Sequence, residues 1–235
     1  MPSASDIEKT NNNGQTQRER YARTFSKRTD NRIYRVASST IKLLGNRFLY
    51  SWAAGRVAHL GEQRSLSILD AGCGDGIFRR FVSLRHRYTG LDFSLRPLLR
   101  ARKTTSDNYV LGDLMHLPFP DAAFDMVVSL QAVQYLLCPG IAVRECQRVL
   151  KAGGTLLLSV PNRDCVKYRL QGTPPVQVAE FDCQSVAKLL SSSSLLPRRI
   201  DGRGFWLPVP KMSVHLPGRY ARQYALAWTA EAHKD

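Results

Sequence analysis

A glycine-rich turn that follows an acidic residue is the clearest sign of chemistry in this sequence. Asp70 comes just before a turn that contains Gly72, Gly74 and Gly76. Because glycines have no side chain, the backbone of such a turn can come close to a ligand. A dinucleotide-binding turn needs a third small residue where Ile77 stands, and the carboxylate of Asp70 would repel a pyrophosphate. The turn therefore favours a ligand that carries an amine or another cation.

Two more carboxylates stand at the ends of the next two predicted strands. Asp92 ends the second strand, and Asp113 comes after the third. In open α/β sheets, ligands bind outside the carboxyl ends of the strands, where a carboxylate can accept hydrogen bonds from both hydroxyls of a ribose. Asp92 therefore predicts a nucleoside with an unphosphorylated 2′-hydroxyl, and Asp113 repeats the arrangement.

The elements that must hold these residues alternate between strands and helices. Short apolar runs predict strands over residues 67–71, 88–92, 109–112, 124–130, 155–160 and 222–230. Helices are predicted over residues 77–86, 95–103, 141–150 and 183–190. Strands that alternate with helices imply crossover connections and a parallel sheet with helices on both faces. The chain is therefore predicted to be an α/β protein with a doubly wound sheet.

Two segments outside this alternation could cover the site. Apolar residues at helical spacing within residues 31–60 predict one or two amphipathic helices, which could cap one face of the sheet. Residues 208–217 are rich in proline and predict a long loop. This loop could be a lid or a wall of the substrate site, or a surface connection.

Cysteine and histidine usage argues against a metal site. The five cysteines form no CxxC pair, and the five histidines form no metal-binding motif, so we expect reduced thiols and no metal. Residues 1–17 are polar, without an apolar signal segment, and predict a disordered leader. No apolar run is long enough to predict a transmembrane segment. These features predict a cytoplasmic protein.

Positive charge is the unusual feature of the composition. The chain has 34 Lys and Arg residues against 19 Asp and Glu residues, which gives a formal net charge of +15. Much of the excess lies in residues 18–47 and 79–103. Such a surface would attract nucleic acid, an anionic membrane or an acidic protein partner, or it could simply be well solvated.

Four segments that occur in order along the chain carry a family resemblance. They are ILDAGCGDG, YTGLDFS, LGDLMHLPFPDAAFDMVVS and ECQRVLKAGGTLLLSVPN, within residues 66–162. In these segments the chain resembles class I S-adenosyl-L-methionine (SAM) dependent methyltransferases, particularly the ubiquinone-biosynthesis-like group, methyltransferase type 11. The resemblance implies a Rossmann-like sheet of seven strands, mostly parallel. It also implies that SAM is the methyl donor and that S-adenosyl-L-homocysteine (SAH) is a product.

The resemblance also assigns contacts with the cofactor. Asp70 and the backbone from Gly72 to Gly74 would hold the methionine end of SAM, and Asp92 would bind the ribose hydroxyls. Asp113 would contact the adenine amino group, with Leu114 stacking nearby. The full predicted set of cofactor-binding residues is Asp70, Gly72, Cys73, Gly74, Gly76, Asp92, Phe93, Asp113, Leu114 and Leu130. In this set Leu130 would line the methionine side, and Cys73 is expected to pack between the glycines rather than to react.

Methyl transfer makes few demands on side-chain chemistry. It is an in-line displacement with a good leaving group, so positioning and desolvation can supply most of the acceleration. If the acceptor must lose a proton, the family-like candidates for the catalytic base are His116 and Tyr135, although His116 is also compatible with a structural role. Gln131, Gln134 and Asn162 could orient an acceptor or could simply pack.

Several kinds of acceptor are compatible with these motifs. A small molecule methylated on oxygen, nitrogen or carbon is the first hypothesis, because the core motifs are close to the ubiquinone-like group. RNA is the second, favoured by the basic run RERYARTFSKRTDNRIYR, although SLQA lacks the Pro-Pro signature of related amino-methylating enzymes. The third is an acceptor on an acidic carrier protein, since LQAVQYL is similar to malonyl-carrier methyltransferases of biotin synthesis. The fourth is a non-catalytic SAM-binding protein.

The resemblance also suggests how the chain is divided. After the leader, residues 18–235 are expected to form a single methyltransferase domain. Its parts would be an N-terminal helical cap over residues 18–64, a SAM-binding core over residues 65–162, and a C-terminal region over residues 163–235 that holds the substrate side and the last strands.

Overall fold

A single mixed sheet is the framework of the computed structural model, which describes residues 32–172, 177–209, 212–219 and 225–235. Within these residues the sheet has eight strands in the order β3-β2-β1-β4-β5-β8-β6-β7. The strands are β1 (Ser67–Ala71), β2 (Arg87–Asp92), β3 (Asn108–Leu111), β4 (Phe124–Leu130), β5 (Leu150–Pro161), β6 (Leu196–Val209), β7 (Met212–Arg219) and β8 (Ala225–His233). β1 to β5 pair in parallel, whereas β8 runs antiparallel to both β5 and β6.

The predicted fold class is confirmed, with one strand more than the seven expected. The additional strand is β7, which covers most of the segment predicted to be a Pro-rich loop. β7 pairs antiparallel with β6 and lies at the edge of the sheet. Proline lacks a backbone N–H but is tolerated in an edge strand, whose outer side needs no ladder partner. Proline content alone therefore misidentified this strand.

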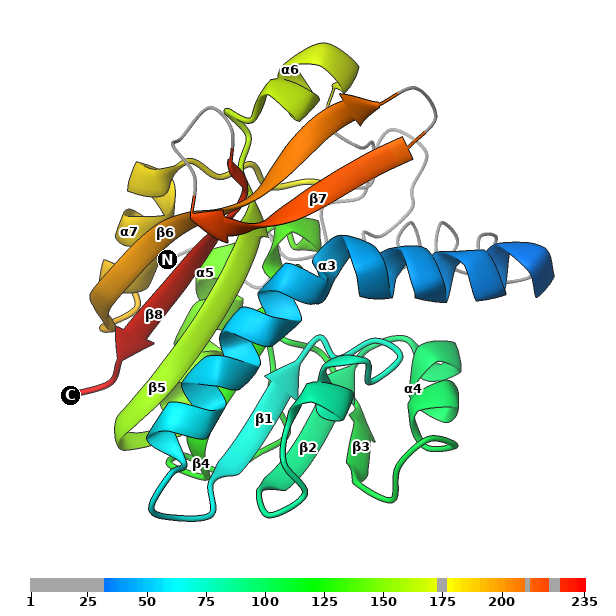
Figure 1. The fold of residues 1–235 in the computed structure, drawn as a ribbon. Helices are drawn as coiled ribbons and strands as arrows, with labels where there is room; N and C mark the ends of the chain where they lie inside the picture. The colour runs from blue at the N-terminus through cyan, green and yellow to red at the C-terminus, as the bar shows by residue number, and fades with distance from the viewer. Residues whose placement is uncertain (1–31, 173–176, 210–211, 220–224) are drawn as a thin grey trace, which may run out of the picture.

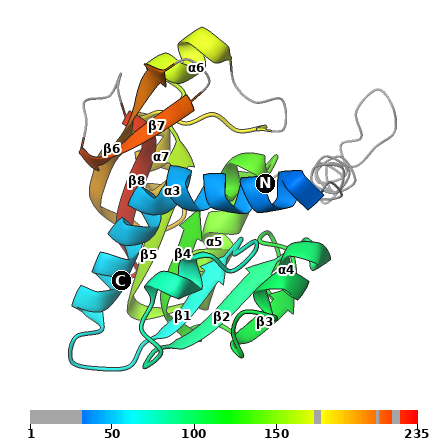
Figure 2. The same cartoon turned by 45° about the vertical axis from the view of Figure 1, so that its right-hand side comes forward.

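Helices cover the sheet on both faces (Figure 1). The α-helices are α3 (Arg32–Leu60), α4 (Leu95–Ala101), α5 (Pro139–Val149), α6 (Val166–Gln171) and α7 (Cys183–Ser191), and two short 3-10 helices are η1 (Phe78–Phe81) and η2 (Val133–Tyr135). Figure 2 shows that α3 passes along one face of the sheet while α5 lies behind it. Residues 31–60 were predicted to form one or two helices, and α3 is one continuous helix over nearly all of them.

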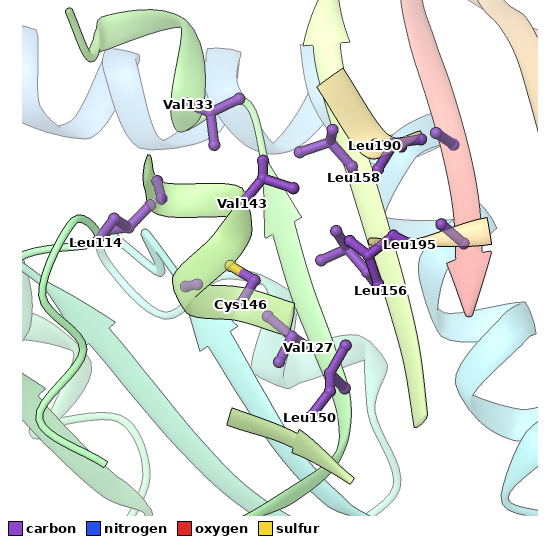
Figure 3. Close-up of a cluster of buried hydrophobic side chains, with 14 of the residues drawn as sticks. Leu114, Val127, Val133, Val143, Cys146, Leu150, Leu156, Leu158, Leu190 and Leu195 are labelled. Carbon is purple, nitrogen blue, oxygen red and sulfur yellow. The ribbon is translucent and has the colours of Figure 1, made fainter. Parts of the chain in front are cut away.

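Side chains of neighbouring strand residues divide between two cores. Met126 and Val128 of β4 belong to the core under α3 and α4, together with Ala53 and Val57 of α3. Val127 points to the opposite face, where α5 and α7 contribute Val143, Cys146 and Leu190 to the other core (Figure 3). Successive strand residues point to opposite faces, and both faces are covered, so β4 is a nearly continuous apolar run.

The helix predicted over residues 77–86 is wrong beyond its first turn. Only η1 forms, and it ends at Phe81. The guanidinium of Arg79 is buried and donates hydrogen bonds to the carbonyl oxygens of Val82 and Ser83, in addition to an ion pair with Asp107 at 2.6 Å. Arg79 thereby satisfies carbonyl groups outside a helical ladder, which sequence periodicity does not reveal.

Some predictions fall on residues outside this description. The leader over residues 1–17 and the basic run up to residue 31 lie there, and the division into cap, core and C-terminal region stays a prediction. Among the described residues, no helix is both long and apolar enough to cross a membrane.

Candidate functional site

The glycine turn after β1 is fastened to the end of β2. The backbone N–H groups of Gly72 and Cys73 both donate to the carbonyl oxygen of Leu91, at 2.8 and 2.9 Å. Gly72 and Gly74 have φ values of 88° and 54°, in the left-handed region that glycine adopts without strain. A Cβ atom on Gly72 would lie 2.4 Å from the Cβ of Ala132. Gly72 is therefore required by space as well as by conformation.

Asp92 connects this turn to the second strand. One carboxylate oxygen of Asp92 accepts a hydrogen bond from the N–H of Gly74, and the other accepts one from the N–H of Ser94, each at 2.9 Å. Ser94 is the N-cap residue of α4. The carboxylate is almost fully buried and is held in a fixed orientation at the carboxyl edge of the sheet. Phe93 follows it and is half-buried.

Asp70 is buried below the turn and is paired with a tyrosine. The hydroxyl of Tyr88 donates a hydrogen bond to the Asp70 carboxylate. Burial raises the pKa of Asp70 to about 7; the Tyr88 hydrogen bond opposes this rise, and the nearby negative charge of Asp92 adds to it. A buried carboxylate of this kind is costly to ionise without a cation beside it. The position therefore suits an amine-bearing ligand.

Cys73 is placed for packing, as the sequence suggested. Burial, followed by the charges of Asp70 and Asp92, raises the pKa of the Cys73 thiol well above its usual range. The thiol therefore stays protonated and is a poor nucleophile. A Cβ atom on Gly90 would lie 2.9 Å from the Cys73 sulfur, so the side chain fills the space that this glycine leaves.

The turn after β3 contains two of the predicted adenine contacts. The Asp113 carboxylate accepts a hydrogen bond from the N–H of Met115 at 2.9 Å, and the Asp113 carbonyl accepts one from the N–H of His116 at 3.1 Å. Leu114 is buried, and its side chain lies 3.9 Å from the position of a Cβ on Gly72. Leu114 therefore packs beside the glycine turn, whereas the His116 side chain is exposed.

The end of β4 forms a polar cluster with β5. Beyond the half-buried Leu130, Gln131 has a φ of 57°, a conformation that non-glycine residues adopt at a cost and that is frequent at functional sites. The amide group of Gln131 donates to the hydroxyl of Ser159 at 3.2 Å. Gln134 is buried, and its side-chain oxygen has no hydrogen-bond partner in the described part of the chain. We call Gln131, Gln134 and Ser159 the polar cluster.

Tyr135 and Asn162, two other candidates, differ in their surroundings. Tyr135 is half-buried in η2. Burial raises the pKa of Tyr168, on α6, to about 12, and the electrostatic interaction with Tyr135 adds to this rise. Asn162 is fully buried and bonds to the carbonyl of Ala225 at 2.8 Å and to the indole N–H of Trp228 at 3.0 Å. These bonds occupy both ends of the amide, so Asn162 links β5 to β8.

Sequence reasoning missed residues that support the turn from outside its motif. Tyr50 of α3 stacks near Phe78 and Phe81, with ring centroids 6.4 and 5.4 Å away. Burial raises the pKa of Tyr50 to about 12; a hydrogen bond with Asn46 opposes this rise, and the negative charges of Asp70 and Asp75 add to it. The signal was faint, because Tyr50 lies 20 positions before Asp70 in a helix predicted only to cover the sheet.

Arg100 of α4 was also missed. Its guanidinium binds the carboxylate of Asp75, inside the glycine turn, with nitrogen to oxygen distances of 2.6 and 3.0 Å. The ion pair fastens the turn to α4 in addition to the bonds from β2. Sequence reasoning counted Arg100 only as one of many basic residues after position 79.

Comparison with known proteins gives the family of these strands. Residues 69–158 match the family described as a methyltransferase domain. The chain is 40% identical over 111 residues to a malonyl-[acyl-carrier protein] O-methyltransferase of Erwinia pyrifoliae. This aligned segment covers 46% of this chain and 42% of that protein. The chain is 39% identical over 107 residues to the enzyme of the same name from Yersinia pestis, with 44% and 40% covered. The matches thus span less than half the length of these relatives.

Solved structures extend the likeness to the whole fold. A SAM-dependent methyltransferase from Thermotoga maritima superposes with a TM-score of 0.65 at 18% sequence identity, covering 92% of this chain and all of that chain. At this identity the likeness shows the fold alone. The family match, in contrast, spans the strands that hold the glycine turn, Asp92 and the carboxyl end of β4, and it identifies residues 69–158 as a methyltransferase domain.

Proposed function

We propose that this protein transfers the methyl group of SAM to a small-molecule acceptor, with SAH as the second product. The observation that carries the proposal is the glycine turn, which Leu91 and Asp92 of β2 and Arg100 of α4 hold in place beside a buried Asp70. The family match indicates a methyltransferase. Our proposal concerns the acceptor of the methyl group.

The residues at the turn fit the parts of SAM. Asp70, which has no cationic partner among the residues that the structure describes, would face the amino group of the methionine end, and the open backbone at Gly74 would follow that end. Asp92 would accept hydrogen bonds from the ribose hydroxyls. Asp113 and Leu114 would lie beside the adenine, with Phe93 near the ribose and Leu130 near the methionine. SAM supplies an electrophilic methyl group on a sulfonium.

The polar cluster is the proposed acceptor side. The side-chain oxygen of Gln134, which has no partner within the described ranges, would accept a hydrogen bond from a hydroxyl or amine of the acceptor, and Gln131 and Ser159 would orient that group. Tyr135, in the same 3-10 helix as Gln134, is the better placed of the two candidate bases, because His116 is exposed in the turn after β3. The fixed orientation of these groups would provide positioning, which is the main demand of methyl transfer.

A malonyl group on an acyl carrier protein is the second candidate acceptor. The two relatives described above are malonyl-[acyl-carrier protein] O-methyltransferases by name, and each is about 40% identical to this chain over more than 100 residues. The net charge of +15 would favour docking of an acidic carrier. A carrier-bound carboxylate needs no base, since it is already deprotonated at neutral pH.

Transfer of radiolabelled methyl groups from SAM tests both candidates. The acceptors would be a filtered extract of low-molecular-mass metabolites, a malonyl thioester of a small thiol, and malonyl-acyl carrier protein. Labelling of the extract or the small thioester supports the first candidate, and labelling of the carrier alone supports the second. If the wild type transferred methyl groups no faster than the variant Asp92→Ala with every acceptor, the proposal would be overturned.

A further inference from the structure

A strongly charged pocket lies where α3 crosses β6 and β8. Trp52 and Arg56 of α3 line it, together with Arg199, Asp201 and Arg203 of β6 and Glu231 of β8. The cavity itself has a volume of about 50 Å³ and is partly open to solvent. We call it the arginine pocket. None of its residues belongs to the proposed SAM site or to the polar cluster.

Too few carboxylates face the arginines of this pocket. Asp201 pairs with two arginines of the lining, Arg199 at 2.6 Å and Arg203 at 3.4 Å, and with Arg219, outside the lining, at 2.9 Å. Glu231 pairs with Arg56 at 2.6 Å. Among the described residues, this network of ion pairs therefore joins four guanidinium groups to two carboxylates, which leaves two positive charges in excess.

The excess charge is partly shielded from water. The side chain of Arg203 is only 17% exposed, and its guanidinium lies 5.5 Å from the ring centre of Trp52. Burial lowers the pKa of Arg203, and the charges of Arg199 and Arg219 add to this effect, against the opposing charge of Asp201. Like charges gathered in a partly buried place are unfavourable unless an anion joins them.

Hydrogen-bond donors remain for such an anion. A guanidinium carries five N–H groups, and the three arginines that share Asp201 can use only some of theirs on its two oxygens. The Nε atom of Arg56 is buried and has no hydrogen-bond partner in the ranges that the structure describes. Arg56 comes from the helix, whereas Arg199 and Arg203 come from the sheet, so their donors approach the pocket from different sides.

We propose that the arginine pocket binds a dianion of the phosphate class, either free phosphate or the phosphate group of a larger ligand. A doubly charged phosphate matches the two excess positive charges, and its tetrahedral oxygens can meet donors that converge from the helix and from the sheet. Arginine forks are suited to phosphate oxygens. A dicarboxylate such as malonate spreads its charge over two separate groups and fits a compact pocket less well.

Isothermal titration of the full chain with inorganic phosphate tests the site, with chloride used to hold the ionic strength constant. Glycerol 3-phosphate and malonate are titrated in parallel. The variants are Arg56→Gln and Arg199→Gln, and the matched control is Arg64→Gln, which removes an arginine that pairs with Asp125 at 2.9 Å outside the pocket. SAM affinity within twofold of the wild type shows that each variant is folded.

The expected result is saturable phosphate binding that weakens at least tenfold in both pocket variants and less than twofold in the control. Tighter binding of glycerol 3-phosphate than of phosphate would assign the site to a larger ligand, and the reverse would assign it to the free ion. Phosphate binding that chloride abolishes, or that both pocket variants retain, would overturn the proposal. Tighter binding of malonate than of phosphate would overturn it as well. If Arg56→Gln does not fold, the result for Arg199→Gln alone tests the proposal, because the side chain of Arg199 is 48% exposed and its replacement leaves the core intact.

Discussion

At the scale of single residues, Asp70 is the group whose charge state controls the site. Its pKa of about 7 lies above the ordinary value of 3.8. The folded protein therefore holds a proton on Asp70 that the unfolded chain loses between about pH 4 and pH 7. The contribution of this group to stability is greatest below pH 4 and decreases as the pH rises through 7, unless a cation binds beside it.

SAM affinity should consequently rise with pH. If the amino group of SAM needs an ionised Asp70, the affinity should be about tenfold higher at pH 7.5 than at pH 6 and should level off above pH 7. Calorimetry at several pH values measures this. The variant Asp70→Asn should bind weakly and with little pH dependence. Equal affinity of the wild type at pH 6 and pH 7.5 would contradict the assignment of Asp70.

Gly72 offers a second test at this scale. Gly72→Ala places a Cβ 2.4 Å from that of Ala132 and adds the strain of a φ of 88°, so the turn must move and SAM affinity should fall at least tenfold. Gly153→Ala is the matched control, since its φ is 69° and its surroundings are open. Both variants should lose about 1 to 2 kcal/mol of stability from backbone strain. Normal SAM binding by Gly72→Ala would show that the turn is not part of the site.

At the scale of elements, sequence patterns were most reliable where spacing and burial agree. The strands on either side of the glycine turn were predicted to within one residue, because each is a short apolar run bounded by turn residues. The contacts from Arg100 to Asp75 and from Tyr88 to Asp70 come from other elements and depend on packing that no local pattern encodes. The last strand was predicted over residues 222–230; β8 extends to His233, three residues further, and residues 222–224 lie outside the described residues.

The link between β5 and β8 depends on Asn162. Asn162→Ala should lower the free energy of unfolding by at least about 2 kcal/mol, because it leaves the Ala225 carbonyl and the Trp228 N–H buried without a partner. Chemical denaturation measures the loss. Asn108→Ala, at an exposed position in β3, should change stability by less than about 0.5 kcal/mol. A stable Asn162→Ala variant with a raised KM for an acceptor would instead favour the acceptor role.

At the scale of the whole molecule, the fold class and the family followed from the order of motifs along the chain. The acceptor did not follow, because it depends on side chains that meet only in three dimensions, such as Gln131 after β4 with Ser159 at the end of β5. The cytoplasmic location and the absence of a metal stay predictions. The arginine pocket was also invisible in sequence, since it joins α3 to strands more than 140 residues later.

The positive charge of the molecule predicts how it binds RNA. Exposed basic residues surround β2 and α4, and they include Arg80, Arg85, Arg87, Arg96 and Arg102. Binding of tRNA measured on filters should be weak and should fall steeply with salt concentration, as expected for phosphate contacts alone. Addition of tRNA should not increase SAH formation. RNA-dependent SAH formation would make nucleic acid the acceptor and would displace the small-molecule proposal.

The central claim is that the carboxyl edge of the sheet binds SAM through Asp92. Isothermal titration of SAM into the wild type, Asp92→Ala and the exposed control Asp121→Ala tests it most directly. Loss of two charge-assisted hydrogen bonds should weaken binding by on the order of 2 to 4 kcal/mol in Asp92→Ala. The control should bind as the wild type does. Equal SAM affinity of Asp92→Ala and the wild type would contradict the account.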